Sequence, residues 1–251
     1  MYAVNDGPER GASETVLRTE NVSKSFGGVQ ALSDVSVSIP AGAVVAVVGP
    51  NGSGKTTFIR TVVGDLRPTA GSITYTGPDT ERPVGYLPQE PPFRPGFSAA
   101  ETLAFYSSLV EGREPDRLLE RVGLAAAADR NVEDLSGGMR QLLGIAQATI
   151  GEPPLVVLDE PASGLDPMMS ERVFETAAEI ADSSRTVVLS SHDLSLVETT
   201  ADAVVILHRG TVAAMGSQSA LREQYGADSL RGVLTEITGD SRVVTVMGDS
   251  R

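Results

Sequence analysis

The chain has 251 residues, a hydrophobic content of 41% and a formal net charge of −13. It contains no cysteine, which excludes disulfides and cysteine metal sites, and its two histidines are too few for a histidine-rich metal site. General nucleic-acid binding depends on Lys and Arg contacts to phosphates, so the acidic balance argues against that class of function.

Only two of the 20 Lys and Arg residues are lysines, Lys24 and Lys55. A GC-rich genome would favour arginine codons, whereas a salt-adapted cytoplasm would favour an acidic, well-hydrated surface, and both explanations stay open. Residues 1–15 lack the basic and apolar stretches of a secretory signal, and the longest apolar runs are of strand length. We therefore expect a soluble cytoplasmic protein with one domain, 16–238, and flexible tails at 1–15 and 239–251.

Strand-like and helix-like segments alternate along the chain, which predicts an α/β fold with a mainly parallel sheet and right-handed crossovers. The predicted strands are Val16–Arg18, Val35–Ile39, Ala43–Val48, Ser72–Thr76, Val84–Leu87, Leu155–Leu158, Thr186–Ser190 and Ala203–Leu207, with a hairpin return at Gly210–Met215. The predicted helices are Thr56–Val63, Ala99–Leu109, Asp116–Val122, Ser170–Asp182, Leu194–Thr200 and Ser217–Tyr225. Prolines cluster after residue 87, and we interpret residues 90–150, approximately, as an α-helical insertion.

A glycine-rich loop follows the buried strand Ala43–Val48, and residues 49–56 read GPNGSGKT. Strand, glycine loop and helix in this order are the context of a phosphate-binding loop, whose backbone N–H groups cradle phosphate oxygens. In this motif Lys55 reaches the β- and γ-phosphates, and the Thr56 hydroxyl binds Mg²⁺. The residues assigned to nucleotide binding here are Gly49, Pro50, Asn51, Gly52, Ser53, Gly54, Lys55, Thr56 and Thr57.

Two carboxylates end the apolar strand at Leu155–Leu158, where the sequence reads LVVLDE. Because side chains alternate across a strand, Asp159 and Glu160 start in different directions. Asp159 suits a metal held through water, and Glu160 suits the attacking water as a general base. A solvated acidic turn is the alternative interpretation.

A second phosphate-binding device is expected at residues 135–141, which read LSGGMRQ. Ser136 is a suitable N-cap, and the exposed N–H groups and dipole of the following helix favour an anion. This segment lies too far along the chain to belong to the first loop. Two such devices indicate a nucleotide clamped between two copies of the protein.

The chain, over about residues 16–238, resembles the nucleotide-binding subunit of an ATP-binding cassette (ABC) transporter. Besides the three motifs above, the family's order includes Gln89 after a strand, the segment Ser163–Asp166, and His192 after the next strand. The resemblance implies a P-loop NTPase core, an N-terminal antiparallel β-subdomain and a helical insertion that carries the LSGGMRQ signature. Met139 replaces the family's most common glutamine, in a form familiar among exporter-type members.

The resemblance also implies roles for individual residues. Ser136, Gly137 and Gly138 would contact the γ-phosphate of ATP held by the opposite subunit. Gln89 would touch Mg²⁺ and the water, and His192 would contact the γ-phosphate and orient the water. The remaining roles are Asp166 at the subunit interface and Phe26 stacked on adenine, although Phe26 also suits a partly buried core position. The implied catalytic residues are therefore Glu160, His192 and Gln89, and the implied metal-binding residues are Thr56, Gln89 and Asp159.

ATP and Mg²⁺ are the implied ligands, and the implied partners are an identical or related cassette and an integral membrane permease. The permease would meet the groove near Gln89 and the segment Pro91–Phe97 at the cytoplasmic face of the membrane. The signature form, Phe93–Tyr106 and Leu230–Thr238 resemble exporter-type members, including drug-efflux subunits and a subunit for nitrous oxide reductase maturation. An importer subunit stays open as an alternative, as does a DNA-repair or ribosome-associated ATPase.

Overall fold

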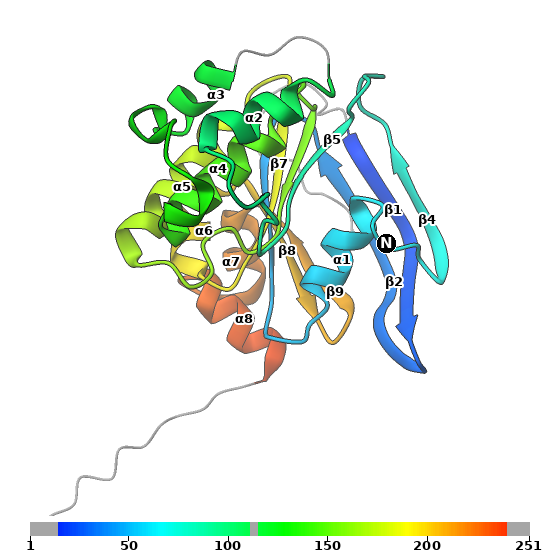
Figure 1. The fold of residues 1–251 in the computed structure, drawn as a ribbon. Helices are drawn as coiled ribbons and strands as arrows, with labels where there is room; N and C mark the ends of the chain where they lie inside the picture. Colours follow the sequence, from blue (N-terminus) through cyan, green and yellow to red (C-terminus); the bar gives the residue numbers. More distant parts are fainter. Residues whose placement is uncertain (1–14, 111–114, 240–251) are drawn as a thin grey trace, which may run out of the picture.

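Two β-sheets form the frame of the molecule in the computed structural model, which describes residues 15–110 and 115–239. The smaller sheet is antiparallel, with the strand order β2-β1-β4 (Figure 1). Its strands are β1 (Thr15–Phe26), β2 (Val29–Pro40) and β4 (Ala70–Tyr75). Residues 1–14 and 240–251, most of the two expected tails, lie outside the described residues.

The first two strands are much longer than the sequence predicts, and both predicted boundaries are wrong. Gly27 and Gly28 have φ values of 52° and 89°, so they form a two-residue hairpin turn that lets β1 and β2 continue to Phe26 and Val29. The register shifts along this pair, and the outer halves of both strands are polar. The resulting loss of regular apolar alternation hides these halves from a periodicity analysis.

The larger sheet has the order β5-β6-β7-β3-β8-β9, and only the β8–β9 pair is antiparallel. The predicted mainly parallel sheet and hairpin return are therefore confirmed. Its strands are β3 (Val44–Val48), β5 (Val84–Leu87), β6 (Leu155–Leu158), β7 (Thr186–Ser191), β8 (Ala203–His208) and β9 (Thr211–Gly216). Every residue of β3, β6 and β7 is buried, as expected of strands covered on both faces.

Helices cover the larger sheet on both faces, and α1 lies between the two sheets (Figure 1). The helices are α1 (Lys55–Val62), α2 (Ala99–Ser107), α3 (Pro115–Arg121), α4 (Gly137–Ala148), α5 (Pro167–Ile180), α6 (Leu194–Thr200), α7 (Gln218–Tyr225) and α8 (Leu230–Thr238). Short 3₁₀ turns occupy Ala125–Ala127 and Val132–Asp134. Among the described helices none has the length and apolarity to cross a bilayer.

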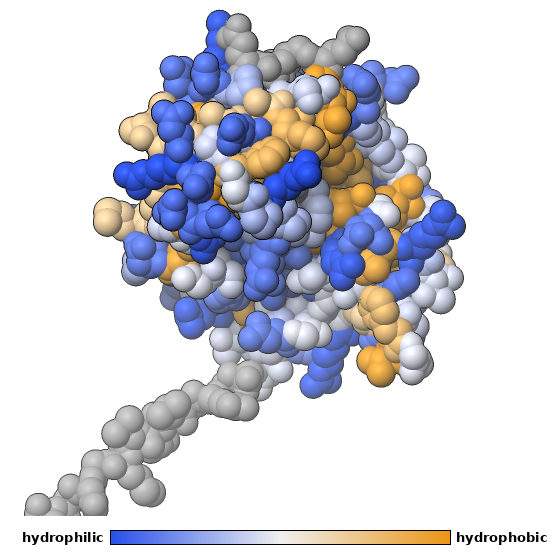
Figure 2. All heavy atoms as spheres, viewed as in Figure 1, coloured by the Kyte–Doolittle hydropathy of each residue, from blue (hydrophilic) through white to orange (hydrophobic). Residues whose placement is uncertain are grey.

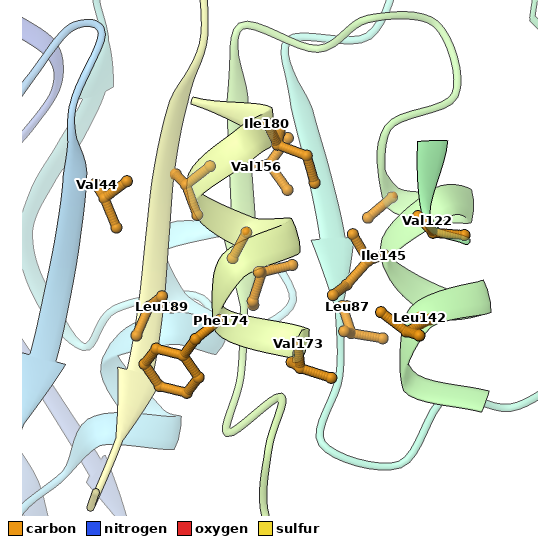
Figure 3. Packing of buried hydrophobic residues seen from close by; sticks show 14 of the residues in the cluster. Val44, Leu87, Val122, Leu142, Ile145, Val156, Val173, Phe174, Ile180 and Leu189 are labelled. Atoms are coloured by element: carbon orange, nitrogen blue, oxygen red, sulfur yellow. The ribbon is translucent and has the colours of Figure 1, made fainter. Parts of the chain in front are cut away.

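Alternation along β3 divides the interior into two cores. Val45 and Val47 pack with α1 and the small sheet, whereas Val44, Ala46 and Val48 pack with the helices on the opposite face. Figure 3 shows the second core, where Phe174 of α5 lies beside Leu189 of β7. The sheet is thereby held rigidly from both sides, and its strand ends are fixed in space.

Helix α5 begins three residues before its predicted start at Ser170. The Asp166 side chain accepts a hydrogen bond from Met169 N at 3.0 Å, and Pro167 occupies the first helical turn. An acidic N-cap followed by proline is a strong helix-start signal. Asp166 is therefore a cap of α5 as well as an expected interface residue.

The β5–α4 contact provides a test of the packing. A Cβ atom on Gly85 would overlap the main-chain oxygen of Ala148, so Gly85→Ala must push α4 away from the sheet. We expect a loss of about 1–3 kcal/mol in the free energy of unfolding, measured by urea titration. Gly216→Ala is the matched control, because its Cβ would meet only ordinary contacts at 3.8–3.9 Å. Equal urea midpoints of unfolding for Gly85→Ala and Gly216→Ala would contradict this close packing of β5 against α4.

Candidate functional site

The glycine-rich loop lies between β3 and the start of α1, with a main-chain shape that only glycine fits at two points. A Cβ on Gly49 would overlap Leu207 O, and one on Gly54 would lie 2.8 Å from Ala31 O. Gly54 is also the N-cap of α1, with φ of 105° and no side-chain capping bond. The first N–H groups of α1 are therefore available to an anion.

The turn between β8 and β9 supports this loop from behind. Gly210 N donates to Ser53 O at 3.0 Å, and Gly210 O accepts from Ser33 N at 2.8 Å. A Cβ on Gly210 would lie 2.7 Å from Ala31 O. Contacts among the Ala31–Ser33 segment, Ser53 and Gly210 thus hold the glycine-rich loop in place. No sequence motif indicated this support.

Asp159 and Glu160 follow β6 and are joined through Ser190 of β7. Ser190 Oγ accepts from Glu160 N at 2.8 Å and donates to Asp159 Oδ1 at 2.7 Å. Thr56 Oγ1 donates to the same Asp159 oxygen at 3.4 Å. Glu160 has φ of 47°, a conformation that is uncommon for a residue other than glycine and that the Ser190 bond helps to hold.

Asp159 is only 1% exposed, and this burial raises the pKa of its carboxyl group, with the nearby charge of Glu160 adding to the rise. The hydrogen bonds from Ser190 and Thr56 and the charge of Lys55 act in the opposite direction. Burial dominates because it penalises the charged form. The ionised carboxylate therefore costs folding free energy at neutral pH.

Glu160 lies between two basic groups. Lys55 Nζ is 3.5 Å from Glu160 Oε1, and His192 Nδ1 is 2.8 Å from Glu160 Oε2. Lys55 Nζ also donates to Gly49 O at 3.0 Å. Lys55 begins α1, whereas Glu160 and His192 follow the ends of β6 and β7, so the structure brings together a lysine, a carboxylate and a histidine that the sequence places far apart.

A cleft of about 500 Å³ opens beside this network, and we call it the P-loop cleft. It is lined by Ala31, Asn51, Gly52, Ser53, Gly54, Lys55, Thr56, Thr57, Gln89, Glu160, Ser163 and His192. Most of the expected loop residues line it, together with Gln89. Ala31 and Ser163 also line the cleft, although the sequence did not indicate them as site residues. Ala31 lies in the part of β2 that precedes the predicted start of this strand at Val35.

Phe26 is not among the residues that line the P-loop cleft. It ends β1, is 47% exposed, and has the Lys24 ammonium 5.1 Å from its ring centroid. The cleft residue Ala31 lies on the paired strand β2. The hairpin thus carries both residues, but the described structure does not place the ring in the cleft wall.

A second cavity of about 670 Å³ shares Thr56 and Gln89 with the P-loop cleft and adds Asp159. Hydroxyl, amide and carboxylate oxygens are the donors that Mg²⁺ prefers, so these three side chains fit that ion together with substrate phosphates. The described residues contain no group of three or more His, Cys, Asp or Glu side chains suited to a metal. A cation here would therefore depend on phosphate oxygens as well as on the protein.

The LSGGMRQ segment begins α4 and lies apart from the P-loop cleft. Ser136 caps α4 by accepting from Met139 N at 3.2 Å. Met169 occupies the space that a Cβ on Gly138 would need, and Leu165 lies 3.5 Å from such an atom on Gly137. Neither Ser136, Gly137 nor Gly138 lines the P-loop cleft, so the chain does not bring its two expected phosphate-binding devices together.

Comparisons with known proteins agree on one family. A family model described as ABC transporter matches residues 32–163. An uncharacterized ABC transporter ATP-binding protein, YdbJ of Bacillus subtilis, is 38% identical over 213 residues, covering 80% of this chain and 69% of the relative. The Nod factor export ATP-binding protein I of Cupriavidus pinatubonensis is 32% identical over 251 residues, covering 90% and 77%. A solved ATP-binding subunit of an ABC transporter has a TM-score of 0.79 at 30% identity, covering 89% of this chain and all of that one.

The burial of Asp159 predicts a pH-dependent gain in stability for Asp159→Asn. A folded-state pKa above the unfolded value means that ionisation costs stability at pH 7, and that this cost fades as the pH falls toward the pKa. We expect the melting temperature of the protein without nucleotide or Mg²⁺ to rise by about 2–4 °C at pH 7, and by less in acid. Asp65→Asn, at an exposed ion pair with Arg60, is the control. A lower melting temperature for Asp159→Asn at pH 7 would contradict a raised pKa for Asp159 in the folded protein.

Proposed function

This chain belongs to the family of ABC transporter ATP-binding proteins, and we propose how its residues carry out the ATP hydrolysis that powers transport. The observation that carries the proposal is the Lys55–Glu160–His192 network at the wall of the P-loop cleft. It places a cation, a carboxylate and an imidazole around one space of about 500 Å³. ATP is the substrate that this space receives.

The triphosphate of ATP binds along the glycine loop. The free N–H groups at the start of α1 and the Lys55 ammonium supply the positive charge that the β- and γ-phosphates need. Thr56, Asp159 and Gln89 would hold Mg²⁺, which when bound neutralises charge on those phosphates. Asn51, Ser53 and Thr57 complete the wall around the phosphates.

Glu160 acts as the general base for the attacking water. Its carboxylate is oriented by the contact to His192 Nδ1, and its backbone is held by Ser190. His192 and Gln89 line the same cleft. We assign His192 to the γ-phosphate and the attacking water, and Gln89 to the water and Mg²⁺. Proton acceptance by a fixed carboxylate beside the phosphates is the chemistry that hydrolysis requires.

A second cassette completes each site. Ser136, Gly137 and Gly138 lie outside their own chain's cleft, so their N–H groups serve the γ-phosphate of ATP on a partner chain. Asp166 begins α5 beside this segment and lies at the same interface. Two ATP molecules then act as a bridge that stabilises the closed pair by mass action, and hydrolysis removes it. The partner is an identical chain or a related cassette.

The adenine base stacks on Phe26. One side of the ring is near the Lys24 ammonium, and the exposed remainder is available to a base. Stacking on an aromatic ring is worth about 1–3 kcal/mol and tolerates different bases, so GTP should also bind. This position lies beyond the P-loop cleft along the β1–β2 hairpin.

The permease contacts the surface beside Gln89, at the cytoplasmic face of the membrane. Figure 2 shows apolar side chains gathered over α2. An aromatic group made of Phe97, Phe105 and Tyr106 lies there, with the Arg94 guanidinium over the first two rings. An apolar group rimmed by charge suits a protein contact, whereas the net charge of −13 disfavours nucleic acid. The relative named for Nod factor export supports export as the direction of transport.

Glu160→Gln tests the catalytic assignment. The variant keeps the size of the side chain but cannot accept a proton, so hydrolysis should fall about 10²–10⁴-fold while ATP still binds. Size-exclusion chromatography with ATP and Mg²⁺ should show a lasting closed pair. Glu179→Gln, an exposed change on α5, should behave as wild type. Turnover near the wild-type rate in Glu160→Gln would exclude Glu160 as the base.

Lys55→Ala tests the phosphate cradle. Loss of a charged hydrogen bond to the phosphates should weaken ATP binding about 10-fold to 100-fold, measured by isothermal titration calorimetry. Arg60→Ala removes an exposed cation from the same helix, where the residue is paired with Asp65, and should change affinity little. If both variants bind ATP like wild type, the triphosphate does not lie against Lys55.

A further inference from the structure

One face of α4 is attached to the loop that carries Gln89. The Gln141 side chain is 7% exposed, and its Nε2 donates to the main-chain oxygen of Gln89 at 2.8 Å. Gln141 Oε1 is buried and has no hydrogen-bond partner in the described part of the chain. The amide is therefore held in the protein interior by its bond to Gln89.

The same face of α4 is packed tightly against β5 and the start of the loop. A Cβ on Gly144 would overlap Leu87 Cδ1 and lie 3.5 Å from Pro91 Cβ. Gly85 of β5 likewise leaves no space for a Cβ against Ala148 O. Residues 141, 144 and 148 share one face of a helix, so this face of α4 and the β5–Gln89 segment form one closely packed unit.

One end of this unit lies at the P-loop cleft, and the other end is the start of α4. Gln89 lines the P-loop cleft, whereas Ser136 and Gly137 form the N-terminal end of α4. A third cavity of about 440 Å³ lies between them and is lined by Gln89, Gly137 and Gln141, among others. Ser163 lines both this cavity and the P-loop cleft.

We propose that Gln141 is a positioning residue that links the nucleotide site of its own chain to the signature segment offered to the partner chain. The inference rests on the proposed function. When Gln89 responds to nucleotide in the P-loop cleft, the Gln141 bond carries that displacement to α4. This displacement of α4 changes the orientation of Ser136 and Gly137, and it thereby changes the nucleotide site of the partner chain. Each site of the pair thereby senses the occupancy of the other.

The test compares Gln141→Met with Gln147→Met in the full chain. Methionine has a similar length to glutamine but cannot donate the bond, and Gln147 is a half-buried residue on the same helix with no such contact to the Gln89 loop. Two properties are measured: the Kd for a fluorescent ATP analogue under monomeric conditions, and the kcat and Hill coefficient of ATP hydrolysis under pairing conditions.

Gln141→Met should leave the Kd unchanged, lower kcat roughly fivefold, as for one hydrogen bond of ordinary net strength, and bring the Hill coefficient toward one. Gln141→Glu, which turns an acceptor toward Gln89 O, should lower kcat at least as far. A merely structural role would move Kd and kcat together. That outcome would overturn the inference, as would a kcat or Hill coefficient equal to that of Gln147→Met.

Failure of the inference differs from failure of the proposed function. If wild type hydrolyses ATP cooperatively and Gln141→Met matches Gln147→Met, only the link through Gln141 is wrong. If wild type neither binds nor hydrolyses ATP, the proposed function itself is wrong, and with it the premise of the link.

Discussion

The parallel register of β3, β6 and β7 is the constraint on which the candidate site depends. Val48 pairs with Ser191, and Leu158 pairs with Leu189, so the three strands end close together. Their residues are buried on both faces and offer no place for a charged side chain until the strands end. The charged residues that follow must therefore collect at one edge of the sheet, as is general for open α/β folds.

In the proposed function, that edge supplies only part of what a bound triphosphate needs. The P-loop cleft has Lys55, the α1 N-terminus and the Glu160–His192 pair on one side, while the capped start of α4 belongs to a different surface. The attachment of α4 to the Gln89 loop by Gln141 gives these two surfaces a physical connection within one chain. The proposed pairing of cassettes and the proposed communication between sites both depend on this one arrangement.

The sequence predicts those parts of this structure that local patterns determine. The apolar run of β3, the glycine loop and the capped start of α4 each depend on neighbouring residues, and the structure has them where they are expected. Gly27 and Gly28 extend β1 and β2 through a turn that polar strand halves obscure. Asp166 starts α5 early because its capping bond outweighs the apolar pattern that begins at Ser170.

Other features could not be predicted because they arise from tertiary contacts. The Ser190 bond that holds Glu160 at φ of 47° joins the ends of two strands, and the support of the loop by Gly210 joins three segments. No periodicity or motif records such bonds. The position of Phe26 outside the cleft wall likewise depends on the twist and length of a hairpin, which composition does not determine.

Turnover per chain as a function of protein concentration tests most directly the claim that each working site needs two chains. ATP hydrolysis would be followed across a dilution series while light scattering reports the fraction of chains that are paired. The account predicts that the rate per chain falls in step with the paired fraction. A constant rate per chain down to concentrations where only monomers are detected would contradict it.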